Sequence, residues 1–342
     1  MAGEDDVTDL AGGIVSDAPG WEAIESALSD LYGEQAPIDF VPSVRRAMGG
    51  KDPLDRVAAY RAEGERPHWH IVTYGLSELY MKEREDPTTS GFGFELTLRL
   101  ARPLAELQPP RWAIAMIQNL ARYVFDSGKL LEPGHHLNAN GPIARDHATA
   151  LRGLLFVTDP ELPAIETPNG RLEFVQTVGV TIDELVAIEA WDGSRFAELL
   201  AARDGLFVTD LARGSVLDDP ATLADVRAAT ERDGSSMGAF STERLQVTGD
   251  ARALELTVSA NVAGYIGRLM RGRLLHERPL TVRAPQIEVL FEPAPVAEWK
   301  RDGEALVVDT TPALAHEIAA TIAARPGVYA FRTLPGFTIR VQ

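Results

Sequence analysis

The chain has 342 residues, a net charge of −17 and no cysteine. The lack of cysteine excludes disulfide frameworks, thiolate metal sites and cysteine nucleophiles, and the acidic balance argues against nucleic-acid binding, because phosphates require a basic surface. The first residues lack the basic-then-apolar order of a signal peptide, and no apolar run approaches the ~18 residues of a membrane span. We therefore expect a cytoplasmic protein of about two domains that does not enter a membrane.

The N-terminal part is predicted to contain a tail, short helices and two strands. Residues 1–19 are acidic and rich in small residues, which predicts a flexible tail. Apolar spacing predicts helices from Trp21, over Val41–Met48 and over Leu54–Ala62. Alternation then predicts strands in HWHIVTYGL (residues 68–76) and GFGFELTLRL (residues 91–100), where Phe92, Phe94, Leu96, Leu98 and Leu100 share one side and Glu95, Thr97 and Arg99 form a polar side.

Helices and strands continue to alternate along the rest of the chain. A helix is predicted over Trp112–Phe125, followed by short strands to about residue 180, a helix over 181–202 and a strand in GLFVTDL (residues 205–211). Later strands are predicted at 243–248, 253–259, 280–283, 287–291, 305–309 and 337–341, and helices at 262–276, which is basic, and 312–324. The fold class is therefore α/β with mixed α+β character, in which mixed sheets are flanked by helices.

A glycine- and serine-rich stretch, Asp233–Gly238, marks the best domain boundary. It predicts an N-terminal domain over residues 20–235, a linker over 236–242 and a smaller C-terminal domain over 243–342. Residues 241–342 carry a net charge of +1, whereas the first 240 residues carry −18. The acidic part would attract a basic partner, although acidity serves solubility equally well.

The candidates for catalysis or metal binding are weak. His68 and His70 point the same way on a strand and could form a metal site with His135 and His136, but histidines of this kind more often form hydrogen bonds. GSSMG (residues 234–238) matches the hydrolase pattern around Ser236, yet the stretch before it is helical in pattern rather than a strand. The carboxylates Glu83, Glu85, Asp86, Asp159 and Glu161 are interpreted as solvated loop residues. We expect no enzyme activity, metal or cofactor.

Several motifs, in order, resemble the Suppressor of fused family. They include GGKDPLDRVAAYR, HWHIVTYGLSELY, SGFGFELTLRL, LARYVF, VTDPELPAIETPNGRLEFVQTVGVTIDEL, LFVTDLARG, ERDGSSMG and RGRLLHERPLTV. The match is dense over residues 20–240 and sparser afterwards. The resemblance implies a two-domain Suppressor of fused-like fold without catalysis, in which an extended partner peptide is gripped between the domains and adds as a β-strand.

The resemblance also implies which residues contact the partner. They would be Tyr123, Leu131 and His135 in the first domain and Arg273, His276 and Arg278 in the second, with Gly238–Ser241 alongside the inserted strand. His135 stands where the family has an acidic contact, and the long insertion of animal members is missing from the C-terminal half. Only four of the 33 basic residues are lysine, a bias that indicates a bacterial source.

Bacterial members of this superfamily resemble immunity proteins, so we expect an immunity protein that neutralises a cognate toxin, in particular a basic one. The alternative is an intracellular regulator that sequesters an endogenous protein such as a transcription factor. A third hypothesis, a serine hydrolase that uses Ser236, depends on the GSSMG match alone.

Overall fold

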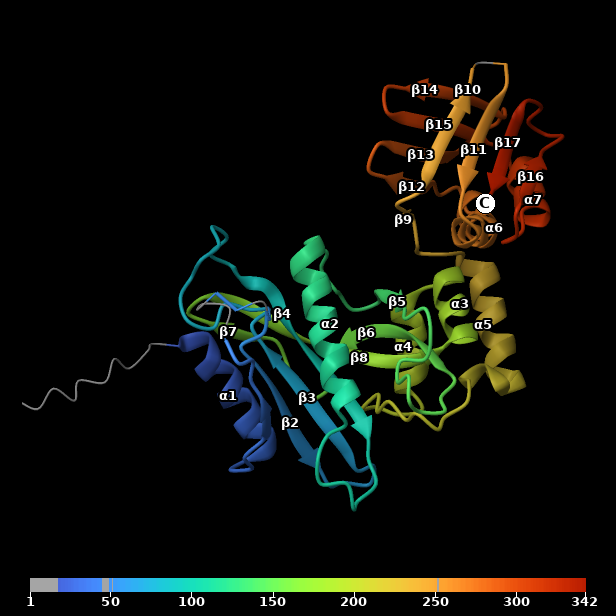
Figure 1. The fold of residues 1–342 in the computed structure, drawn as a ribbon. Helices are drawn as coiled ribbons and strands as arrows, with labels where there is room; N and C mark the ends of the chain where they lie inside the picture. The colour runs from blue at the N-terminus through green and yellow to red at the C-terminus, as the bar shows by residue number, and fades with distance from the viewer. Residues whose placement is uncertain (1–17, 45–48, 51, 251) are drawn as a thin grey trace, which may run out of the picture. The chain divides into compact units, whose positions relative to one another are not determined.

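The computed structural model describes residues 18–44, 49–50, 52–250 and 252–342 and divides into two compact units (Figure 1). Unit 1 comprises Met1–Glu132, Thr158–Val178 and Leu206–Thr209, and unit 2 comprises Pro133–Val157, Gly179–Gly205 and Asp210–Gln342. The fold is mixed α/β, with three sheets that contain both parallel and antiparallel strands. This confirms the predicted fold class. The domain bounds predicted from the sequence remain a prediction.

The largest sheet has eight strands in the order β1-β2-β3-β4-β8-β6-β5, with β7 paired to β8. Its strands are β1 (Ile38–Phe40), β2 (Arg56–Ala62), β3 (His68–Tyr74), β4 (Thr89–Ala101), β5 (His136–Asn138), β6 (Leu151–Thr158), β7 (Ile165–Thr167) and β8 (Gly170–Thr181). β4 and β8 are parallel, whereas the pairs β1–β2, β2–β3, β3–β4, β5–β6 and β7–β8 are antiparallel.

Two helices pack on the strands of unit 1. Helix α1 (Pro19–Tyr32) buries Ile24 and Leu28 among the apolar side chains of β2, β3 and β8. Helix α2 (Arg111–Ser127) packs against β4 through its buried face, as its apolar period predicts. Because Ile71 of β3 lies directly opposite Leu98 of β4, the leucines of β4 share a sheet face with it, as predicted.

Over the described residues, unit 2 combines five α-helices with two smaller sheets. A capping box formed by Thr181 and Glu184 begins α3 (Ile182–Ala190), and Asp192 caps α4 (Gly193–Ala201). A 3-10 turn over Val216–Asp218 and helix α5 (Pro220–Asp233) follow. The four-stranded sheet has the order β10-β11-β17-β16, and the five-stranded sheet has the order β14-β15-β13-β12-β9.

The C-terminal strands surround one apolar core with helices α6 (Ala260–Leu274) and α7 (Pro312–Thr321). The strands are β9 (Ala239–Ser241), β10 (Leu245–Gly249), β11 (Leu254–Val258), β12 (Leu280–Ala284), β13 (Ile287–Pro293), β14 (Glu298–Asp302), β15 (Ala305–Thr310), β16 (Gly327–Ala330) and β17 (Phe337–Val341). Helix α6 contributes Ile266, Leu269 and Met270 to this core, all fully buried.

Several local predictions are wrong. The helix expected over Leu54–Ala62 is strand β2, because its apolar run pairs on both sides with β1 and β3. The helix expected over 181–202 is two helices, separated where Trp191 leaves helical geometry and Asp192 starts a new cap. The strand expected over 205–211 is a single bridge at Thr209, next to a left-handed Phe207.

The ends of other predicted elements also differ. The tail predicted over residues 1–19 lies outside the described residues up to residue 17, and Pro19 already begins α1. Of the helix predicted over Val41–Met48, the first four residues are not helical and the last four lie outside the described residues.

Candidate functional site

Strand β5 forms one open edge of the eight-stranded sheet. It pairs with β6 on one side and ends the strand order. The amide of Ala139 bonds to the carbonyl of Arg152, and the amide of Phe156 bonds to the carbonyl of His135. Because an antiparallel strand alternates between bonded and outward-facing residues, the backbone groups of His136 and Asn138 point to the open edge.

Strand β9 forms a second open edge, also in unit 2. It pairs in parallel with β12 and ends the order of the five-stranded sheet. The Gly238 carbonyl accepts from the Thr281 amide, and the Thr242 amide donates to the Arg283 carbonyl. The backbone groups of Ala239 and Ser241 therefore face away from β12. Each edge offers two residues to an incoming strand.

The segment before β9 is fixed to the helices of unit 2. The Ser235 hydroxyl donates to the Glu189 carbonyl over 2.6 Å, and the Ser235 amide donates to the Gly272 carbonyl over 2.8 Å. The Ser236 amide donates to the carbonyl of Trp191 over 2.7 Å. A stretch that the composition marks as a linker is therefore held by α3 and α6 at the entry to β9.

Two arginines, Arg273 near the end of α6 and Arg278 just after this helix, form hydrogen bonds with this segment. Arg273 donates through Nη1 to the Ser235 carbonyl over 2.9 Å and through Nε to the Pro279 carbonyl over 3.0 Å. Arg278 donates to the carbonyl of Asp233. Burial, and then the charge of Arg278, lower the pKa of Arg273 below its usual value. Both guanidiniums thus bind backbone carbonyls of this chain.

Glycines allow the close approach of these side chains. A Cβ at Gly238 would lie 3.0 Å from Arg273 Nη2, and a Cβ at Gly234 would lie 2.5 Å from His276 Cδ2. Gly234 also adopts a left-handed φ of 65° at the end of α5. The structure thus places Gly238, Arg273, His276 and Arg278 around one short segment.

An aromatic contact also packs β9 against helix α6. Phe240 packs against Tyr265 of α6, with ring centroids 5.1 Å apart, and the guanidinium of Arg268 lies 4.9 Å from the Tyr265 centroid. Arg268 in turn donates to the buried carboxylate of Glu189 over 2.6 Å. Burial, and then the Glu189 charge, raise the pKa of Tyr265 to about 12.

The remaining predicted contacts lie elsewhere. Tyr123 is half-buried on α2 in unit 1, and Leu131 is only 3% exposed in the same unit. His135, in unit 2, is exposed directly before β5. A contact between a partner and the Leu131 side chain would therefore require this residue to move. Glu189 lies in no motif, and Ser235, although it lies in GSSMG, was not expected to have a role; the contacts of both follow only from their distant partners.

The histidines of β3 have structural partners. His70 Nδ1 lies 2.8 Å from the Tyr32 hydroxyl, and His70 Nε2 lies 3.2 Å from Asp159 Oδ2. Burial, and then the charge of Arg99, lower the pKa of His70 to about 4. Among the residues that the structure describes, no group of three or more potential ligands is arranged to hold a metal ion.

The interpretation of Asp159 as a solvated residue is wrong. Its side chain is fully buried and receives two hydrogen bonds from Arg99, of 2.7 and 3.0 Å. Burial alone would raise the pKa of Asp159, but the hydrogen bonds from His70 and Arg99 hold it well below its usual range. Glu83, Glu85 and Asp86 are exposed, as predicted.

The GSSMG match lacks the geometry of a hydrolase elbow. Helix α5, not a strand, precedes it, and Gly234 ends that helix. The Ser236 side chain is exposed, whereas its neighbour Ser235 is buried.

None of the helices in the described ranges combines the length and the apolar character that a bilayer crossing demands.

Comparisons with known proteins agree with these motifs. The sequence model described as Suppressor of fused protein (SUFU) matches residues 50–214. The Suppressor of fused homologs of Homo sapiens and Mus musculus are each 36% identical over 239 residues, which cover 65% of this chain and 49% of theirs. The chain therefore spans about half the length of the curated relatives it matches.

Solved structures extend the likeness over most of the chain. The crystal structure of Drosophila Suppressor of Fused has a TM-score of 0.78 and 22% identity, covering 95% of this chain and 97% of the other, and so has the same fold. A chain of the Sufu–Fu complex has a TM-score of 0.57 and 32% identity, covering 61% of this chain and 98% of the other. The chain belongs to the Suppressor of fused family.

Proposed function

We propose that this chain is a non-enzymatic adaptor that binds an extended segment of a partner protein by strand addition. The observation that carries the proposal is the pair of open edges, β5 and β9, in one compact unit. An extended peptide that pairs with such an edge gains backbone hydrogen bonds irrespective of its sequence, and side-chain pockets then add specificity. The Sufu–Fu complex, to which a chain with 32% identity belongs, supports a protein partner.

The held conformation of the segment before β9 favours this mode of binding. An edge that is already ordered loses little conformational entropy when a strand is added. The arginine contacts at Ser235 and Asp233 supply that order. In the family-based form of the proposal, the partner lies between the two domains predicted from the sequence and contacts Tyr123, Leu131, His135 and the Arg273–Arg278 region.

The partner that we propose first is a toxin, so that the chain would be an immunity protein. The charge of −18 over the first 240 residues supports a basic partner, because opposite charge speeds encounter. The alternative is an intracellular regulator that sequesters an endogenous protein. A toxin gene beside the gene for this chain, whose product binds the purified chain, would favour the first role, and binding only to a protein encoded elsewhere would favour the second.

Proline substitution tests the strand-addition mechanism. Asn138→Pro and Ser241→Pro each remove an outward-facing amide while keeping the bonds to β6 and β12, since edge positions tolerate proline. The matched controls are Asn138→Ala and Ser241→Ala, which change the side chain but keep the amide. A partner is first recovered with the wild-type chain from its native host and identified, and its affinity for each variant is then measured.

We expect at least one proline variant to lose the partner while both alanine variants retain it. Equal binding by all four variants would refute strand addition at these edges. Arg273→Ala and Tyr123→Ala, tested in the same assay, examine the family-based contacts. If neither change weakens binding, those two contacts are not used.

A further inference from the structure

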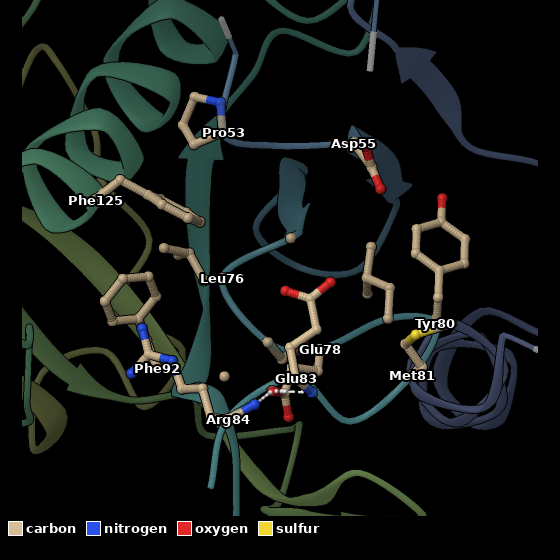
Figure 2. Close-up of a pocket in the computed structure, with 14 residues that line it drawn as sticks. Pro53, Asp55, Leu76, Glu78, Tyr80, Met81, Glu83, Arg84, Phe92 and Phe125 are labelled. Carbon is tan, nitrogen blue, oxygen red and sulfur yellow. Dashed lines mark hydrogen bonds between the residues drawn. The ribbon is translucent and has the colours of Figure 1, made fainter. Parts of the chain in front are cut away.

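Unit 1 contains an open pocket of about 560 Å³ that neither edge strand uses. Its lining comes from the segment between β3 and β4, from the start of β4, from the residues before β2 and from Phe125 of α2. Figure 2 shows Phe92 and Phe125 on one side of this pocket and Asp55 and Tyr80 on the other. The pocket therefore has an aromatic wall, formed by Phe92 and Phe125, and an opposite wall that carries the Asp55 carboxylate beside Tyr80.

The backbone around the pocket is rigidly held by a buried carboxylate. Glu95, fully buried, accepts from the amides of Gly75 and Ser77, each over 2.9 Å, and from the Ser77 hydroxyl over 2.6 Å. Gly91 has a φ of 58°, and a Cβ there would lie 2.6 Å from the Leu76 carbonyl oxygen. The shape of the pocket is therefore set before any ligand arrives.

Two carboxylates of the lining, Glu78 and Asp55, differ in their hydrogen-bond partners. Glu78 accepts from Lys82 Nζ over 2.8 Å and from the amides of Glu83 and Arg84. Asp55 is only 7% exposed, yet its Oδ1 atom has no hydrogen-bond partner among the described residues. The Oδ1 atom is out of contact with solvent, so a cationic ligand in the pocket would bond to the other oxygen of the Asp55 carboxylate and offset its charge.

The aromatic wall already accommodates a guanidinium. Arg84 stacks its guanidinium over the Phe92 ring, 4.1 Å from the centroid, and Phe125 meets that ring edge-on at 4.8 Å. Met81, which is 69% exposed, adds apolar surface, and the exposed Glu83 adds a second carboxylate. The Phe92 ring is thus covered by Arg84, while Met81 and Glu83 offer apolar and acidic surface to the aliphatic stem and the charge of an incoming cation.

We propose that this pocket binds an arginine or lysine side chain presented by a partner polypeptide, with Asp55 as its counter-ion. The proposal does not depend on strand addition, because the pocket lies in unit 1 and the two edges proposed for strand addition, β5 and β9, lie in unit 2. It gives the acidity of the N-terminal part a specific site in addition to a general attraction.

The test uses two small probes that differ mainly in charge. N-acetyl-arginine amide and its neutral counterpart N-acetyl-citrulline amide are titrated into the ¹⁵N-labelled full chain, and the amide signals of residues 75–78 and 91–92 are followed. We expect saturable shifts with the arginine probe only. Asp55→Asn should weaken binding about tenfold or more, as for loss of a charge-assisted hydrogen bond.

Two further variants make the result decisive. Asp225→Asn removes the same charge from an exposed position on α5 and should leave the affinity unchanged. Glu83→Gln alters only an exposed side chain and should weaken binding two- to threefold, about the strength of an exposed ion pair. Equal shifts with citrulline, or unchanged affinity in Asp55→Asn, would overturn the proposal.

Discussion

Replacing Arg99 with methionine removes the positive charge from a fully buried polar cluster while keeping an unbranched apolar stem. Arg99 donates to both carboxylate oxygens of Asp159, over 2.7 and 3.0 Å, and to Glu161 over 3.0 Å. The Arg99 and Asp159 side chains are both 0% exposed. The substitution would leave the Asp159 carboxylate buried without its main counter-charge.

The expected cost is about 3–5 kcal/mol, the range for breaking a buried ion pair by removing one partner. For a folding unit of this size, that corresponds to a fall of about 6–20 °C in the midpoint of thermal unfolding. The assay is urea unfolding at pH 7, followed by circular dichroism. Arg171→Met is the matched control, because its pair with Glu173 is half-exposed, at 55% and 42%, and should contribute less than about 1 kcal/mol.

A double variant separates the stranded charge from lost packing. Asp159→Asn added to Arg99→Met removes the uncompensated carboxylate and should recover part of the loss. If Arg99→Met cost no more than Arg171→Met, the reasoning that Asp159 depends on Arg99 would be refuted. If the double variant were less stable than Arg99→Met, packing rather than charge would be the cause.

Three other predictions concern single groups. The pKa of His70 is about 4 in the fold and about 6.5 in the unfolded chain. Neutral His70 therefore contributes its full stability above pH 6.5, and the free energy of unfolding falls by about 3 kcal/mol on acidification to pH 4. Urea unfolding at several pH values should show a smaller fall for His70→Gln. Gly193→Ala should destabilise unit 2 by about 2 kcal/mol or more in thermal unfolding, because the new Cβ would lie 1.9 Å from the Gly134 carbonyl oxygen. Gly205→Ala is the control and should not destabilise unit 2, because open space surrounds this position. Thr181→Ala should lower the free energy of unfolding by about 0.5–2 kcal/mol, because it removes half of the capping box on α3. Asp192→Ala, which removes the cap of α4, should lower it by an equal amount if the two caps are similar in strength.

The sequence was most informative where a period was clear over many residues. The alternation in β4 and the helical periods of α2 and α6 predicted elements of the correct type. Period fails in a short continuous apolar run, which explains why β2 was interpreted as a helix. Short strands such as β5 and β9 have three residues each, too few for any periodic signal.

The candidate site depended on information that no local pattern contains. The motif around Arg273 indicated the correct region, but the carbonyls it binds, of Ser235 and Pro279, follow only from the folded path of the chain. Asp159 seemed solvated because proline follows it, whereas its partner Arg99 lies 60 residues earlier. Pairing between distant strands decides burial in such cases, and spacing along the chain does not encode it.

The division of unit 1 into three chain segments has a consequence for the order of its assembly. The carbonyl of Thr209 accepts the amide of Ala101, and the carbonyls of Leu206 and Phe207 accept the side-chain amide of Gln176. A ribosome makes residues 206–209 only after the helices α3 and α4 of the other unit. Unit 1 therefore remains incompletely bonded during the synthesis of the 27 residues Gly179–Gly205, which belong to unit 2. A nascent chain that stalls in this interval would expose the end of β4 and Gln176 of β8 to chaperones or proteases.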